Sequence, residues 1–141
     1  MNIVLDTNGL LMAISDRSRY HQIWQAFLHG DYKLCVTNEI MEEYVEVISR
    51  NVSERAAEAV IYLILTLPNV RYLDPHFRFK LIETDPDDNK FVDCAIAAGA
   101  KYIVTEDRHF GILKEIPFPK VEAISIDQLL KIIGKKKNIK V

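Results

Sequence analysis

The chain has 141 residues, of which hydrophobic side chains make up 49% and charged side chains 27%. This length fits one domain, and this balance excludes a disordered, collagen-like or low-complexity chain. The 18 basic and 20 acidic side chains give a formal charge of −2, which by itself argues against binding to nucleic acid. The charge is unevenly placed, because five lysines and no acids lie beyond residue 130. We therefore expect an acidic domain at 1–133 and a basic tail at 134–141.

Cysteine use and hydropathy limit where the protein works. Cys35 and Cys94 lie far apart with no paired spacing, so neither a zinc site nor a disulfide framework is expected. The N-terminus carries no signal-peptide pattern, and no apolar run approaches the length that spans a membrane. We expect a cytoplasmic protein without a membrane partner.

Short β-rich runs alternate along the chain with segments of helical periodicity. The β-rich runs predict strands at residues 3–5, 34–36, 70–73, 102–104 and 121–124. The segments between them predict helices near residues 20–27, 38–48, 53–67, 89–98 and 127–133. Asn38 and Ser53 are expected to cap two of these helices, and Gly99 to end the fourth. This alternation indicates a three-layer α/β/α sandwich with a mainly parallel five-stranded sheet.

Two acids follow predicted strands, and ligands of open parallel sheets bind at the carboxyl ends of the strands. Asp6 ends the first strand, where a charge is costly unless a metal ion, a partner or solvent satisfies it. A helix-capping or turn role is the alternative for Asp6. Asp107 lies three residues beyond the fourth strand and is a weak indication when taken alone.

The second predicted helix carries four glutamates, which helical geometry separates. Glu43 falls on the flank of the apolar face, so that it is aimed toward the sheet. Glu39, Glu42 and Glu46 cluster on the opposite side and are expected in solvent. Glu43 is therefore the functional candidate, and the alternative is a boundary glutamate with its stem packed and its head in water.

An acidic cluster precedes and enters the Ala-rich helix. Asp88 falls inside the packed face if the helix begins that early, at an N-terminus that favours an anion. A plain N-cap is the alternative role for Asp88. Asp93 falls on the polar side of the helix, so we expect it at the surface and keep it as a reserve candidate.

The four candidates Asp6, Glu43, Asp88 and Asp107 come from four different elements, and the fold class brings them toward one edge of the sheet. Carboxylates a few ångströms apart raise each other's pKa, so they do not all stay ionised without a counter-charge. A hard divalent cation resolves this conflict, and an all-oxygen site suits Mg²⁺ or Mn²⁺ rather than zinc. Such a site is suited to phosphodiester hydrolysis.

The order and spacing of these motifs resemble the PIN-domain family, and in particular its VapC-like toxin ribonucleases. The matching segments, which lie within a resemblance over residues 1 to about 127, are 3–8, 37–43, 85–91 and 98–107. The family's four acids match Asp6, Glu43, Asp88 and Asp107. The resemblance implies an endonuclease for single-stranded RNA that depends on Mg²⁺ or Mn²⁺. It also implies an antitoxin partner and a homodimer, because many relatives have them.

The resemblance further implies roles for single residues. Asp6, Asp88 and Asp107 would hold the metal ion, and Glu43 would be a further ligand or orient water. The polar neighbours of these acids, Asn8 and Thr105, would position water or phosphate.

Two features lie outside the family pattern. Relatives commonly have a small residue or Arg between the Thr and the Asp of the last motif, where this chain has Glu106. We expect this extra acid to alter metal occupancy or substrate approach. The lysines of the tail add salt-sensitive attraction to RNA or form a frayed solubilising end.

Three other functions stay open. The first is a catalytically inactive PIN-like scaffold, although its intact set of four acids argues against lost activity. The second is a phosphatase with a strand-end Asp nucleophile, a class that carries a second Asp two residues later, where this chain has Asn8. The third is a receiver-type phosphoacceptor, which the lack of an early acidic pair disfavours.

Overall fold

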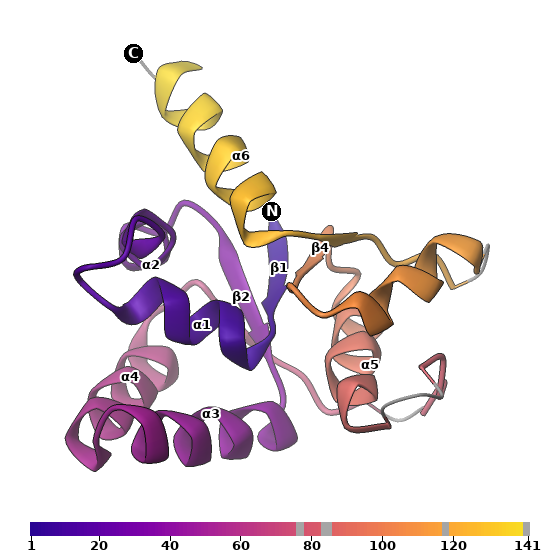
Figure 1. The fold of residues 1–141 in the computed structure, drawn as a ribbon, viewed down its shortest axis with the longest axis horizontal. Coiled ribbons are helices and arrows are strands. Elements are labelled where there is room, and N and C mark those ends of the chain that lie inside the picture. Colours follow the sequence, from indigo (N-terminus) through magenta and orange to yellow (C-terminus); the bar gives the residue numbers. More distant parts are fainter. Residues whose placement is uncertain (76–77, 83–85, 117–118, 140–141) are drawn as a thin grey trace.

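The computed structural model describes residues 1–75, 78–82, 86–116 and 119–139, which form a central sheet with helices on both sides (Figure 1). The strands are β1 (Asn2–Leu5), β2 (Lys33–Val36), β3 (Val70–Tyr72), β4 (Tyr102–Val104) and β5 (Ala123–Ile124). The α-helices are α1 (Thr7–Ile14), α2 (His21–Leu28), α3 (Asn38–Asn51), α4 (Glu54–Thr66), α5 (Asn89–Ala98) and α6 (Ile126–Ile139). Two 3₁₀ helices, η1 (Pro86–Asp88) and η2 (Arg108–Glu115), flank α5 and β4.

The sheet is parallel throughout and has the strand order β3-β2-β1-β4-β5. The chain first builds the sheet outward from β1 through β2 to β3, and then returns to the other side of β1 for β4. Ligands of open α/β sheets bind where the strand order reverses in this way. Leu5 of β1 pairs with Val104 of β4, so the residues that follow these two strands leave the sheet side by side.

The core accounts for the compact apolar runs of the sequence. The side chains of the two runs that predicted β1 and β2 are 0% to 1% exposed, namely Ile3, Val4, Leu5, Leu34, Cys35 and Val36. In Figure 1, α1 and α2 lie on one side of these strands and α5 on the other. The predicted α/β sandwich with a five-stranded parallel sheet is therefore confirmed.

The structure departs from the predicted elements at several places, and neither α1 (Thr7–Ile14) nor η2 (Arg108–Glu115) was among the predicted helices. Thr37, not Asn38, is the N-cap of α3, and its side chain accepts a hydrogen bond from Ile40 N at 3.2 Å. The last strand is shorter than expected and contains residues 123 and 124 alone. The last helix continues past the expected tail boundary at residue 134 and ends at Ile139, so the start of the lysine-rich segment is helical.

Two expectations about cysteines and membranes can be compared with the structure. Cys35 and Cys94 are free thiols, and both are buried. In the part of the chain that the structure covers, no helix combines the length and the apolar character that crossing a membrane requires.

Candidate active site

Asp6 lies at the junction between the central strand and the first helix. Its backbone N–H donates to Val104 O at 3.0 Å, which continues the pairing of β1 with β4 by one residue. Its side chain then starts α1, because Oδ1 accepts a hydrogen bond from Gly9 N at 2.8 Å. Asp6 is 7% exposed. The capping role that the sequence left open is therefore real, and it leaves the second carboxylate oxygen directed elsewhere.

Thr105 connects that second oxygen to the loop after β4. The Thr105 hydroxyl donates to Asp6 Oδ2 at 2.6 Å and accepts from Asp107 N at 3.0 Å. Thr105 is 7% exposed, so this link lies in the interior. The expected task of Thr105 was to position water or phosphate, whereas the hydroxyl here orients Asp6 and the Asp107 backbone. Asn8, its predicted counterpart on α1, is exposed.

The surroundings of Asp6 resist its ionisation. Burial raises the pKa of Asp6 above its usual value, while the hydrogen bonds from Thr105 and Gly9 oppose the rise. The negative charges of Asp107 and Glu106 add to the increase in pKa. Asp6 and Asp107 are therefore close enough to interact, and the end of β1 is a place where added positive charge is favourable.

Glu43 reaches the same region from α3 and is half-buried, as its predicted place on the flank of the helix requires. Thr7, the neighbour of Asp6, donates its hydroxyl to Glu43 Oε2. The other oxygen, Oε1, lies 2.8 Å from Lys90 Nζ in an ion pair whose side chains are 28% and 13% exposed. Glu43 is therefore linked to the start of α1 through Thr7 and to α5 through Lys90.

Asp88 ends η1 and is the N-cap residue of α5. It is half-buried, and its side chain makes no capping hydrogen bond to the helix within the described part of the chain. The plain N-cap alternative is thus not supported by a capping contact. The prediction placed Asp88 in the first turn of the helix, facing inward. Asp88 instead directly precedes α5, which begins at Asn89, and its side chain is half-buried.

Asp93 is not at the surface, and the sequence-based expectation for it is wrong. Its residue is 3% exposed, and Oδ1 accepts a hydrogen bond from Phe79 N at 3.1 Å. The cause is the irregular segment 78–82, which covers the polar side of α5 and removes it from solvent. Burial raises the pKa of Asp93, and the bond from Phe79 and the charge of Arg78 oppose the rise. Buried carboxylates with raised pKa values occur often at functional sites, which keeps Asp93 as a candidate.

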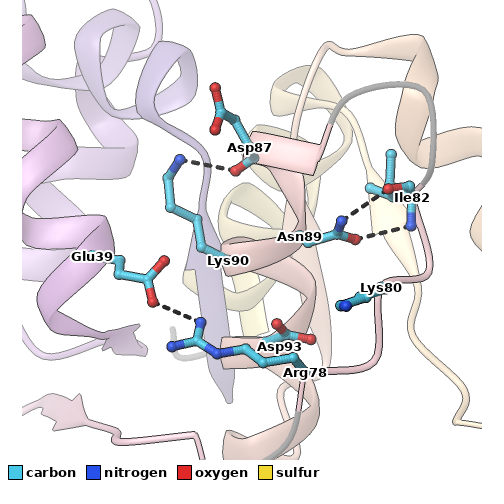
Figure 2. Close-up of a pocket in the computed structure, with 8 residues that line it drawn as sticks. All are labelled: Glu39, Arg78, Lys80, Ile82, Asp87, Asn89, Lys90 and Asp93. Carbon is cyan, nitrogen blue, oxygen red and sulfur yellow. Dashed lines mark hydrogen bonds and ion pairs between the residues drawn. The ribbon is translucent and has the colours of Figure 1, made fainter.

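A cavity of about 600 Å³ lies beside these acids, between the start of α3, segment 78–82 and the start of α5 (Figure 2). Its lining is Glu39, Arg78, Lys80, Ile82, Asp87, Asn89, Lys90 and Asp93. Arg78 pairs with Glu39 at 2.6 Å, and the Asn89 side chain holds both the N–H and the carbonyl of Ile82, at 2.9 and 2.8 Å. Asp6 and Asp107 do not line the cavity, and Lys90 is the residue that connects it to Glu43.

Glu106 is directed to another part of the fold than the sequence suggested. Its Oε1 accepts a hydrogen bond from Ile126 N at 2.8 Å, at the start of α6. The side chain thus satisfies a backbone donor of that helix, although its charge still contributes to the raised pKa of Asp6.

The four candidate acids can be tested as metal ligands both by the type of donor atom and by how close together they lie. The candidate ligands offer carboxylate oxygens alone, which suits a hard divalent cation, and burial, with smaller contributions from the charges of Asp107 and Glu106, raises the pKa of Asp6. As arranged here, no three His, Cys, Asp or Glu side chains of the described segments converge as a metal-holding group. Asp6 and Asp107 are together, whereas Glu43 faces an ammonium group. The carboxylate oxygens of the candidate acids suit a divalent cation, and one of these carboxylates, that of Glu43, is paired with the ammonium group of Lys90.

Lys90 is the functional candidate that sequence reasoning missed. The signal was its place in the first turn of a helix, where the helix dipole disfavours a cation, two residues after Asp88.

Comparisons with known proteins agree with this fold. A family model described as PIN domain matches residues 2–109. The structure of VapBC2 from Rickettsia felis, bound to a DNA fragment from its promoter, aligns with a TM-score of 0.61 over 89% of this chain and 98% of that chain, at 16% identity. VapBC-1 from nontypeable Haemophilus influenzae gives 0.60 over 90% and 99%, also at 16% identity.

A third structure is VapC20 from Mycobacterium tuberculosis, described as a toxin that cleaves the sarcin-ricin loop. It aligns with a TM-score of 0.57 at 16% identity, over 77% of this chain and 92% of that chain. At this level of identity the likeness is one of fold. The sequence matches none of the curated proteins with which it was compared.

Proposed function

The chain belongs to the PIN-domain family, and on that premise we propose that it is a divalent-metal-dependent endoribonuclease that hydrolyses phosphodiester bonds of single-stranded RNA. The observation that carries this proposal is the link from Asp6 through the Thr105 hydroxyl to Asp107. This link keeps Asp6, a buried carboxylate with a raised pKa, beside Asp107 at the point where the strand order reverses. A parallel sheet binds its ligand at that point.

In this proposal Asp6, Asp88 and Asp107 hold Mg²⁺ or Mn²⁺. When bound, such an ion lowers the pKa of a water molecule and stabilises charge on a phosphoryl oxygen. Thr105 keeps Asp6 oriented and opposes the effect of burial on its ionisation. Asp93 takes the place of Asp88 in this set if Asp88→Asn leaves metal binding unchanged and Asp93→Asn abolishes it.

Glu43 and Asn8 have supporting roles in the proposal. Glu43 is a further ligand or the group that orients the attacking water, and its hydrogen bond from Thr7 keeps it beside the end of β1. Asn8 is exposed on the first turn of α1, which gives its amide access to a phosphate of the substrate.

The test is cleavage of a labelled single-stranded RNA by the purified protein. We expect cleavage with Mn²⁺ or Mg²⁺, none with EDTA, and none by a folded Asp6→Asn variant. Glu58→Gln serves as a matched control, because Glu58 is an exposed carboxylate on α4. Cleavage that persists in EDTA would contradict the metal-dependent mechanism.

We further propose that the protein acts in the cytoplasm as the toxin of a toxin-antitoxin pair, with an antitoxin as partner and a second copy of the chain as dimer partner. The similarity in fold to chains of VapBC complexes supports this setting. Expression of the protein is then expected to arrest growth, and expression of Asp6→Asn is not. Sedimentation of the purified chain tests the homodimer.

The alternative functions give different outcomes. An inactive scaffold predicts that calorimetry detects no divalent-ion binding. A phosphatase predicts a phosphorylated Asp6, yet Asn8 stands where the second acid of that class is needed. The residue at position 8 therefore disfavours the phosphatase.

A further inference from the structure

Lys90 lies where its own helix disfavours it. It is the second residue of α5, and the positive end of a helix dipole repels an ammonium group. Contacts of Nζ hold the side chain there: it lies 2.8 Å from Glu43 Oε1, donates to the Asp87 carbonyl at 2.8 Å, and lies 5.3 Å from the centre of the Phe91 ring. The side chain is 13% exposed, so most of it is removed from water. The acid on α3 therefore helps to hold Lys90 at a position that the dipole of α5 disfavours.

The partner of Lys90 is one of the four candidate acids. Glu43 is 28% exposed and also accepts from the hydroxyl of Thr7, the residue next to Asp6. Removing one partner of a largely buried ion pair leaves the other charge uncompensated. The carboxylate of Glu43 thus has a cation in place before any metal ion arrives.

We propose that Lys90 is the resident counter-cation of the carboxylate site and that its ammonium group competes with a divalent ion for Glu43. This inference rests on the proposed metal-dependent function and assigns a role to a residue outside the four acids. A unit positive charge beside the acids cancels part of the potential that attracts a divalent ion. Lys90 therefore stabilises the metal-free site and lowers its affinity for metal.

The cavity beside α5 gives Lys90 a second position. Lys90 lines this cavity together with the acids Glu39, Asp87 and Asp93 (Figure 2). A lysine side chain is long and flexible, so its ammonium group can leave Glu43 and remain among carboxylates. The charge of Lys90 then stays compensated when a metal ion binds to Glu43.

The direct test is Mn²⁺ binding by calorimetry without RNA. Lys90→Gln removes the charge, and we expect it to bind Mn²⁺ about tenfold more tightly than the unaltered protein. Its thermal midpoint in EDTA should be lower, because Glu43 has lost its partner. Lys33→Gln is the matched control: Lys33 is exposed at the amino end of β2, whereas the candidate acids follow the carboxyl ends of the strands, and its loss should leave the affinity unchanged. Equal or weaker Mn²⁺ binding by Lys90→Gln would overturn the proposal.

Two further variants separate the charge of Lys90 from its packing. Lys90→Arg keeps the charge, so its Mn²⁺ affinity should stay near that of the unaltered protein. In a Glu43→Gln background the pair is already broken, so adding Lys90→Gln should give little further gain. The same gain in both backgrounds would show that Lys90 does not act through Glu43.

A measurement on the unaltered protein covers the case in which Lys90→Gln does not fold. NMR of ¹⁵N-labelled lysine ammonium groups, assigned with Lys90→Arg, should show the Lys90 signal shifting on addition of Mg²⁺ while the Lys33 signal stays. A Lys90 signal that does not respond to bound Mg²⁺ would overturn the proposal. If the unaltered protein binds no divalent ion, the proposed nuclease function fails; if it binds and Lys90→Gln binds equally well, the counter-cation role alone fails.

Discussion

The Thr105 hydroxyl lies 2.6 Å from Asp6 Oδ2 and joins the ends of two neighbouring strands. Through the same oxygen it accepts from Asp107 N at 3.0 Å, so one side chain fixes both a carboxylate and the loop that carries the second acid. In the fold, these two strands are the central pair β1 and β4. The arrangement predicts that the hydroxyl matters more than the shape of the residue.

Thr105→Val removes that hydroxyl and keeps the volume. The Asp107 N–H loses its acceptor and Asp6 Oδ2 loses a donor, so we expect the free energy of unfolding to fall by about 1 to 3 kcal/mol. RNA cleavage should fall as well, because Asp6 is no longer oriented. Denaturant unfolding and a cleavage assay measure the two effects. Thr105→Ser retains the hydroxyl and should lie close to the unaltered protein; an equal loss in both variants would exclude the hydroxyl as the cause.

Gly9→Ala tests how closely α1 approaches the site. A Cβ at Gly9 would lie 3.1 Å from Asp6 Oδ1 and 3.6 Å from Val104 O. The gain in helix propensity, about 1 kcal/mol, offsets the crowding, so stability should change little while the displaced carboxylate lowers cleavage. Gly134→Ala is the control, because nothing lies within 4 Å of its added Cβ. It should stabilise α6 and leave cleavage unchanged, whereas full activity of Gly9→Ala would show that Asp6 tolerates displacement.

Asp93 gives a prediction about pH. The pKa of Asp93 is higher in the folded protein than in the unfolded chain. Between these two pKa values the folded protein keeps a proton that the unfolded chain has lost, so the folded protein loses stability as pH rises through this range. Asp93→Asn still accepts from Phe79 N and carries no charge. We expect the variant to gain stability relative to the unaltered protein as pH rises from 3 through the raised pKa, and to hold that gain at neutral pH. Unfolding at a series of pH values measures the difference, which should not depend on pH if Asp93 ionises normally.

Glu106 separates a structural acid from the candidate site. Glu106→Ala removes the acceptor for Ile126 N and should cost about 1 kcal/mol of stability, while Glu106→Gln keeps an acceptor and should cost less. Thermal unfolding distinguishes the two. Both variants should cleave RNA, since the side chain is directed to α6; loss of cleavage in the folded Gln variant would show that the charge of Glu106 is needed.

The central strands of the sheet were predictable because most of their side chains are buried on both faces, so that apolar runs such as residues 3–5 mark them directly. Asp6 and Asp107 were predictable as neighbours because parallel strands end at one edge of the sheet. Helical geometry also placed Glu43 on the correct flank of α3. In each of these cases the position follows from local periodicity and from the topology of the sheet.

The remaining features depend on parts of the chain that meet only in the fold. The exposure of Asp93 was mispredicted because a helical projection does not show that segment 78–82 covers that side of α5. The pairing of Lys90 with Glu43 joins two helices and has no local pattern. The formal charge of −2 likewise does not show where the acids lie: Asp6, Glu106 and Asp107 are gathered near the end of β1, where burial raises the pKa of Asp6.

The most direct measurement is cleavage of a labelled single-stranded RNA by the unaltered protein and by Asp6→Asn, each with Mn²⁺ and with EDTA. Asp6→Asn keeps the size of the side chain and an acceptor for Gly9 N, and denaturant unfolding of the variant checks that lost activity is not lost structure. We predict that the unaltered protein cleaves the RNA with Mn²⁺ and that the other three reactions show no cleavage. Cleavage by Asp6→Asn at the rate of the unaltered protein, or cleavage in EDTA, would contradict it.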